Sequence, residues 1–161
     1  RIFIILPYKE SLDEKKSGAV SIYVKDSLKY SKYKKHITII SSDNFKDSKI
    51  FRNRNYINEF CKKYKNEDIS LIEIHNRPEY VKILRKTFPF TKIVLTYHND
   101  PHKLRGSYLK TEREELLKIC EKIIFISNWV NTLKKPQEAT LPHKGSILYW
   151  LSFSMFRVIQ A

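Results

Sequence analysis

Polar side chains able to bind or transform a ligand stand directly after four short apolar runs of this sequence. The segments that follow the runs are Pro7-Tyr8-Lys9-Glu10, His75-Asn76-Arg77-Pro78-Glu79, His98-Asn99-Asp100-Pro101-His102 and Ser127-Asn128-Trp129. Such runs are typical of buried strands, and open α/β sheets bind ligands outside the carboxyl ends of their strands. The sequence therefore predicts one ligand-binding edge that collects His, Asn, Asp, Arg and Ser side chains.

The segment that begins at His98 is the strongest candidate for chemistry. His98 and His102 stand four residues apart with Asp100 between them. A metal site would need a third ligand, and a Ser-His-Asp hydrolase would need a G-x-S-x-G motif that this sequence lacks. We therefore expect no metal, and hydrogen-bonding chemistry that orients a hydroxylated ligand with His98 near the reacting centre. A purely structural turn is the alternative.

Two other segments are candidates for binding an anion. Gly18 opens a predicted helix whose free N–H groups could hold a phosphate, although the residue could equally serve only to start a helix close to the sheet. Arg77 is a natural partner for a phosphate or carboxylate. Asn76 and Glu79 have capping-box spacing, so Asn76 is expected to cap the next helix. With three glycines, the chain has no G-x-G-x-x-G motif and no P-loop.

The elements that position these residues follow from the apolar pattern. Strands are predicted over 2–6, 36–41, 69–75, 92–97 and 122–126, and helices over 18–32, 56–64, 79–88 and 111–120, the last with a capping box at Thr111. The alternation predicts right-handed βαβ units in an open, doubly wound, mostly parallel, Rossmann-like sheet. Because the strands are apolar on both faces, helices should cover both. Cys61 and Cys120 are expected inside helices as reduced thiols.

Length and composition set the broad class of protein. The chain has 161 residues and 42% apolar content, which suit one globular domain with a packed core. No signal peptide is recognisable, which predicts a cytoplasmic protein. The net charge of +14 is compatible with nucleic acid, an anionic membrane surface or a phosphate-bearing substrate, or with a lysine-rich solvated surface. No RNA-binding signature accompanies the charge, so we expect no specific nucleic acid.

Five segments together resemble the N-terminal domain of glycosyltransferase family 4 enzymes. The similarity extends from about Ile2 to Trp129, and the segments that carry it are Leu6-Pro7-Tyr8-Lys9-Glu10, Gly18-Ala19-Val20-Ser21, Ile74-His75-Asn76-Arg77-Pro78-Glu79, Tyr97-His98-Asn99-Asp100-Pro101 and Phe125-Ile126-Ser127-Asn128-Trp129-Val130. Family members have the GT-B fold, in which two Rossmann-like domains face each other across a cleft. The resemblance implies retaining, metal-independent transfer from a nucleotide sugar to a polysaccharide or lipid-linked glycan acceptor, as in lipopolysaccharide biosynthesis, with no cofactor.

The resemblance also implies roles for single residues. His98 would be the active-site histidine that touches the transferred sugar, and Asp100 would be the second catalytic residue, on the acceptor side. Gly18 and Ala19 would approach the donor's diphosphate, although many members have paired glycines there. The remaining predicted site residues would shape the acceptor side or lead toward the cleft, and they are Asn76, Arg77, Asn99, Ser127 and Trp129.

The predicted organisation is a glycosyltransferase N-terminal domain over 1–133 and a divergent or truncated tail over 134–161. The second domain of the family, with its E-x7-E glutamates, has no counterpart here, so we expect the chain alone to be inactive. The apolar stretch 146–159 is expected to be buried against this domain or in a self-association interface. A peripheral position at the inner face of the plasma membrane is also compatible with this cytoplasmic assignment. Two alternatives stay open: a non-catalytic sugar- or phosphate-binding module, and a basic nucleic-acid-associated domain.

Overall fold

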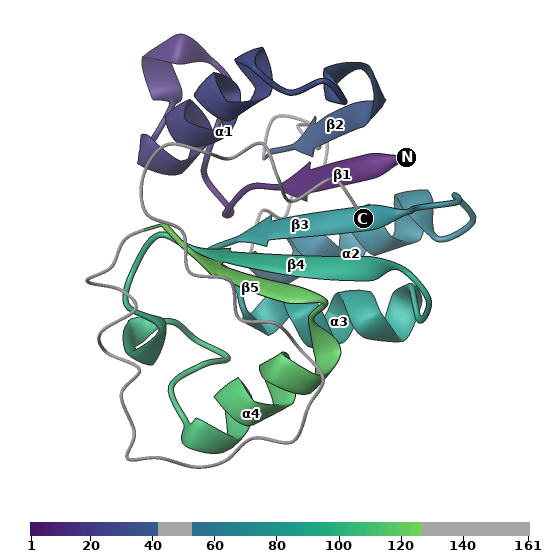
Figure 1. Cartoon of the computed structure of the whole chain (residues 1–161), viewed down its shortest axis with the longest axis vertical. Coiled ribbons are helices and arrows are strands. Elements are labelled where there is room, and N and C mark those ends of the chain that lie inside the picture. The colour runs from purple at the N-terminus through teal and green to yellow at the C-terminus, as the bar shows by residue number, and fades with distance from the viewer. Residues whose placement is uncertain (42–52, 127–161) are drawn as a thin grey trace.

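The computed structural model of the chain describes residues 1–41 and 53–126, and this part contains a five-stranded parallel sheet. The spatial order is β2-β1-β3-β4-β5 (Figure 1). The strands are β1 (Ile2–Ile5), β2 (Ile37–Ile40), β3 (Leu71–His75), β4 (Lys92–Tyr97) and β5 (Lys122–Phe125). The open, parallel, doubly wound sheet predicted from the apolar pattern is thereby confirmed. The tail over 134–161 lies outside the described residues.

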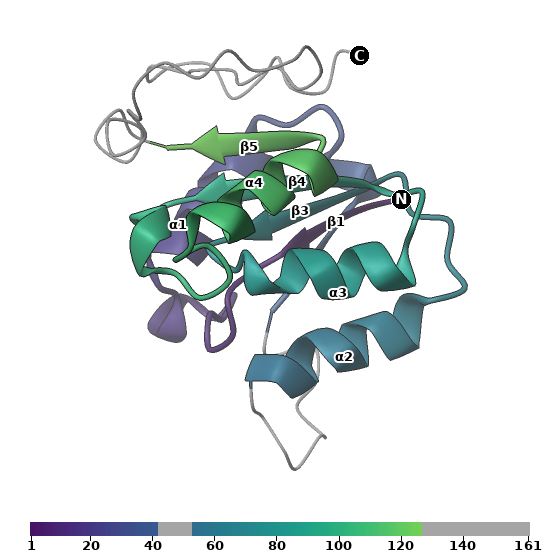
Figure 2. The ribbon, with the colours of Figure 1, turned by 90° about the horizontal axis from the view of Figure 1, so that it is seen from below.

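Four α-helices cover the two faces of this sheet. They are α1 (Ala19–Lys29), α2 (Asn53–Tyr64), α3 (Glu79–Thr87) and α4 (Lys110–Ile119). Buried side chains of α2, α3 and α4 join one core cluster with the sheet, whereas those of α1 join a second cluster. Figure 2 shows α2 and α3 side by side on one side of the strands. This distribution follows from right-handed crossovers, since the chain moves from β1 to β2 in one direction and from β3 to β5 in the other.

The change of direction places the topological switch point between β1 and β3. These strands are neighbours in the sheet, with Ile5 opposite Ile74 near their carboxyl ends. The chain after β1 goes to α1 on one face, and the chain after β3 goes to α3 on the other. Ligands of doubly wound proteins bind at such a point, outside the carboxyl ends of the strands.

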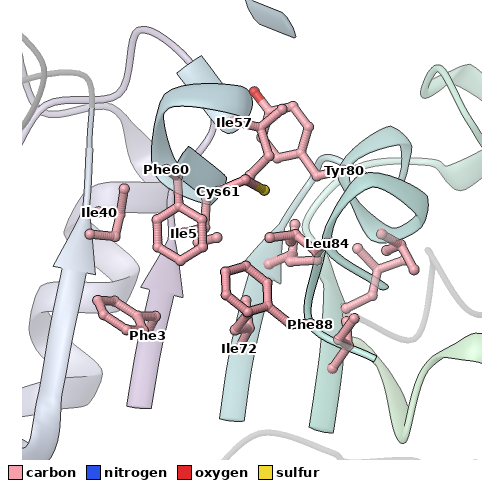
Figure 3. Close-up of a cluster of buried hydrophobic side chains, with 14 of the residues drawn as sticks. Phe3, Ile5, Ile40, Ile57, Phe60, Cys61, Ile72, Tyr80, Leu84 and Phe88 are labelled. Atoms are coloured by element: carbon pink, nitrogen blue, oxygen red, sulfur yellow. The ribbon is translucent and has the colours of Figure 1, made fainter. Parts of the chain in front are cut away.

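The larger core is built from apolar side chains that alternate along the strands. Phe3 and Ile72 are almost fully buried beneath Phe60 of α2 (Figure 3). The rings of Phe3 and Phe60 meet edge to face, with their centroids 5.2 Å apart. Burial of aromatic and aliphatic area on this scale is the main term that holds the sheet and its helices together.

The opposite face of the sheet differs from the prediction of apolar strands on both faces. At β1 it carries Ile4 and Leu6, which pack under α1. At β3, however, the residues that alternate with buried Ile72 and Ile74 are Glu73 and His75. That prediction was therefore wrong at β3, where a carboxylate and an imidazole stand on the α1 face.

Two predicted helix caps were also wrong. The cap of α3 is Pro78, and no side chain caps it, while Asn76 adopts a left-handed backbone with φ 52°. Helix α4 begins at Lys110 rather than at Thr111, and Glu112 reaches back to accept a hydrogen bond from the Leu109 N–H at 3.0 Å. In both places the residue spacing matches a capping box, but the backbone conformation places the helix start at a different residue.

The two cysteines are free thiols, one inside a helix and one just after a helix. Cys61 lies in α2, whereas Cys120 directly follows the last residue of α4, so the prediction of a helical position was wrong for Cys120. Burial raises the pKa of the Cys120 thiol to about 12, although Arg85 nearby acts to lower it. Such a thiol is protonated and unreactive at neutral pH.

The loop between β4 and α4 is fixed by a close approach to α3. Gly106 has φ 86°, and a Cβ added there would lie 2.7 Å from the backbone nitrogen of Glu79. The adjacent Ser107 is buried and donates its hydroxyl to the carbonyl oxygens of Pro101 and Leu104. Only glycine combines the left-handed backbone with this contact, so the loop is held against the start of α3.

Within residues 1–41 and 53–126, no helix combines the length and the apolar character needed to cross a membrane.

Candidate functional site

Asn76 joins the carboxyl ends of β3 and β4. It is 4% exposed, and its N–H donates to the Thr96 carbonyl oxygen at 2.9 Å. Its Oδ1 accepts hydrogen bonds from the N–H groups of His98, at 2.8 Å, and Asn99, at 3.2 Å. Asparagine tolerates the left-handed backbone that this position requires better than most residues do. Asn76 therefore fixes the backbone from which the His98 side chain projects.

The His98 side chain is held by a second histidine and by a tyrosine. Its Nε2 lies 2.8 Å from Nδ1 of His75, which is itself 1% exposed. The Tyr23 ring, from the second turn of α1, meets the His98 ring edge to face, with centroids 4.8 Å apart. His98 is thus half-buried, with one ring nitrogen committed to the protein interior.

A carboxylate continues this arrangement on the α1 face of the sheet. Oε1 of Glu73 lies 3.2 Å from Nε2 of His75 and accepts a hydrogen bond from the Thr96 hydroxyl at 2.9 Å. The His75 Nε2 contact is within ion-pair distance but is not aligned as a full hydrogen bond, and this nitrogen has no other partner in the described part of the chain. We refer to Glu73, His75 and His98 as the carboxylate–histidine chain.

The electrostatics of the carboxylate–histidine chain leave His98 neutral. Burial, and then the unfavourable interaction of a protonated ring with the neighbouring His75, lower the pKa of His98 to about 4, and Glu73 only partly opposes this. Because the folded state resists protonation of His98 and the unfolded state does not, this group disfavours folding as the pH falls below about 6.5. At neutral pH His98 is therefore an uncharged hydrogen-bonding group.

Glu73, by contrast, is ionised. Burial alone would raise the pKa of Glu73, but the neighbouring His75 ring, the hydrogen bond from Thr96 and the more distant His98 ring together lower it. The side chain is 26% exposed. A carboxylate in this state can only accept hydrogen bonds.

The predicted anion site at the start of α1 is occupied by the protein's own carboxylate. Oε2 of Glu10 accepts hydrogen bonds from the N–H of Gly18 at 3.1 Å, and from the N–H at 3.3 Å and the hydroxyl of Ser21. A Cβ added at Gly18 would clash with Oε1 of Glu10, so glycine allows the close approach. An external phosphate could use these N–H groups only after Glu10 had moved away.

Replacement of Glu10 by alanine is expected to lower the free energy of unfolding by about 1–2 kcal/mol, because a charge-assisted cap at a helix N-terminus is lost. Urea denaturation followed by circular dichroism measures this. The matched control is Glu114→Ala, which removes an exposed carboxylate whose ion pair within the described part of the chain is a long one, with Lys110 at 3.8 Å. Equal stability of the two variants would contradict a capping role for Glu10.

The other predicted site residues fall into three groups. Arg77, which directly precedes the N-cap of α3, interacts with its neighbours in the protein: its Nη1 donates to the Asn76 carbonyl oxygen at 3.2 Å, and it interacts with Tyr80 of α3. Asp100 accepts a hydrogen bond from the His102 N–H at 2.9 Å and so caps the short helix Pro101–Lys103, while Asn99 is exposed beside His98. Ser127 and Trp129 lie outside the described residues.

The structure pairs His98 with His75 and not with His102. His102 is exposed, and no group of three metal-ligating side chains occurs within the described ranges. The site residues brought together are Asn76, His98 and Asn99, through hydrogen bonds to one amide oxygen.

Sequence reasoning missed Glu73 and Tyr23 as site residues, and it placed His75 at the ligand-binding edge without assigning it a role. A signal was present for two of them, since Glu73 and His75 alternate with isoleucines in a strand that is otherwise aliphatic. A charged residue inside a buried strand requires a partner, and period-two alternation places Glu73 and His75 on the same face. No comparable signal marked Tyr23, whose spacing is that of an ordinary helix face.

Fold and site together define an open, parallel, Rossmann-like α/β domain with a carboxylate–histidine chain at the carboxyl ends of β3 and β4. Comparison of the chain with protein-family models, curated proteins and solved structures gave no match.

Proposed function

We propose that this chain is the acceptor-side domain of a glycosyltransferase, which transfers a sugar from a nucleotide sugar to a glycan or lipid-linked acceptor. The observation that carries the proposal is the placement of a neutral His98 at the carboxyl edge, beside the switch point, by Asn76 and His75. Uncharged, fixed hydrogen-bonding groups suit the hydroxyls of a sugar. The motif resemblance described above supports the same function.

In this proposal, different residues of the domain contact the donor sugar and the acceptor. His98 contacts the transferred sugar, and the exposed Asn99 and the neighbouring Asp100 contact the acceptor. The diphosphate of the donor would be held mainly by a second domain, as in GT-B enzymes. The occupation of the α1 N-terminus by Glu10 supports this division, because the first domain then offers few free N–H groups to a phosphate there.

The test uses the full-length gene product. It is incubated with nucleotide sugars labelled in the sugar and with a lipid and glycan extract of the source cells, and label transfer to acceptor is followed. We expect transfer from one or a few donors, at rates in the usual enzyme range of about 1 per second or more. Binding of sugars without any transfer or donor hydrolysis would contradict the proposal and favour a non-catalytic binding module.

A further inference from the structure

The carboxylate–histidine chain restricts where protons can reside. One proton lies between Nδ1 of His75 and Nε2 of His98, which are 2.8 Å apart, because two protons would repel each other and none would bring two lone pairs together. The other nitrogen of His75, Nε2, is buried, and its polar neighbour among the described residues is the Glu73 carboxylate at 3.2 Å. A protonated Nε2 would place an N–H near the anion, whereas a bare Nε2 would place a lone pair beside a negative oxygen.

These constraints determine the state of His98. With the proton of a neutral His75 on Nε2, its Nδ1 is an acceptor, and Nε2 of His98 must be the donor between the rings. The remaining nitrogen of His98, Nδ1, is then bare. No described residue forms a hydrogen bond with it, and His98 is half-exposed at the carboxyl edge of the sheet.

We propose that Glu73 and His75 are positioning residues that fix His98 in its Nε2–H form, so that Nδ1 accepts a hydrogen bond from a ligand hydroxyl. This inference rests on the proposed function for the identification of that ligand as a sugar. A bare nitrogen accepts a hydroxyl proton but repels the oxygens of a phosphate or carboxylate. The group that meets His98 is therefore a sugar hydroxyl and not the diphosphate.

One arrangement of protons would reverse this result. If His75 carried protons on both nitrogens, its Nδ1–H would donate to His98, whose own proton would move to Nδ1. That state places an imidazolium in a site that is 1% exposed, beside the Glu73 carboxylate at 3.2 Å. A buried ion pair offsets its desolvation only when it is well hydrogen-bonded, and Nε2 of His75 has no hydrogen-bond partner among the described residues, so the proposal applies to the neutral ring.

The carboxylate–histidine chain also predicts that the protein discriminates between donors with and without the hydroxyl that binds His98. A site built to bind a hydroxyl rejects an analogue that lacks it, often by about 10⁴-fold or more, because its own polar atom is then left unpaired. Deoxy donors, each lacking one hydroxyl, should therefore include one that is used far more poorly than the others. That donor identifies the hydroxyl that meets His98.

The tautomer is tested by NMR on the ligand-free protein labelled with ¹⁵N-histidine, at slightly alkaline pH. We expect a pyridine-type Nδ1 and a pyrrole-type Nε2 for His98, and the same pattern for His75. Spectra in which His98 carries its proton on Nδ1, or in which both nitrogens of His75 are protonated, would overturn the inference. This measurement needs no ligand and no activity.

The positioning role is tested by Glu73→Gln, since an amide can either donate to or accept from His75 and so removes the bias. We expect mixed tautomers at His98 and a kcat reduced about 10- to 100-fold, as when partners that orient a histidine are lost elsewhere. Glu114→Gln is the control and should change neither. An unchanged His98 spectrum in Glu73→Gln would contradict the role. If that variant fails to fold, the wild-type spectrum still decides the tautomer.

The two proposals fail in different ways. Absence of sugar transfer with the expected His98 spectrum would reject the glycosyltransferase and leave the tautomer standing. Transfer by a protein whose His98 carries its proton on Nδ1 would reject only the positioning role.

Discussion

Replacement of His98 by alanine is expected to lower kcat by about 10²- to 10³-fold in the active protein, the usual effect of removing one fixed hydrogen-bonding group from an active site. His98 is the one site histidine that is both half-exposed and rigidly held, by His75 at 2.8 Å and by the edge of Tyr23. The measurement is initial-rate sugar transfer with saturating donor, compared with wild type.

The same substitution should also affect folding. Loss of the His98 ring leaves Nδ1 of the buried His75 without its partner, which costs about 1–3 kcal/mol. His98→Gln is the matched variant, since its amide can still donate to His75. We expect it to recover most of the stability and little of the activity. Full activity in His98→Ala would show that this histidine is structural only.

Replacement of Asn76 by alanine is expected to lower the free energy of unfolding by about 3 kcal/mol. Two backbone N–H groups, those of His98 and Asn99, would lose their acceptor, each at a cost of about 1 kcal/mol or more. Alanine also tolerates the left-handed backbone at φ 52° less well than asparagine, by about 1 kcal/mol. Urea denaturation measures the total loss in the free energy of unfolding, provided that its dependence on urea concentration (the m-value) is the same in the variant and the wild type.

Two further variants at this position separate the causes. Asn76→Gly relieves the backbone but still lacks the acceptor, so it should fall between wild type and alanine. Asn76→Asp keeps an acceptor and should be the least destabilised. If Asn76→Gly had wild-type stability, the hydrogen bonds from Asn76 Oδ1 to the backbone after β4 would contribute nothing to stability. The His98 backbone would then be held by other contacts.

The fold could be predicted from the sequence because the patterns that indicate strands and helices depend on residues close together in the chain. Strand Lys92–Tyr97 was predicted to the residue, and the other strands within two residues at each end, since β-branched runs bounded by polar residues leave few alternatives. Convergence on the carboxyl edge followed from parallel topology alone, which requires no knowledge of strand order. Parallel topology by itself therefore places His98 in the candidate site.

Tertiary structure decided how the polar groups are used. The spacing of Asn76 and Glu79 matches a capping box, but a left-handed backbone directs the amide to β4 instead. Glu10 and Gly18 are eight residues apart, and no local pattern predicts that a loop returns the carboxylate to the helix start.

The carboxylate–histidine chain shows the division between sequence and structure most clearly. Alternation along β3 already places Glu73 and His75 on one face. Their link to His98 depends on the pairing of His75 with Thr96 across β3 and β4, which brings the end of one strand beside the end of the other. Register between strands is set by the packing of the whole sheet, so a contact over 23 residues of sequence cannot be read from either segment alone.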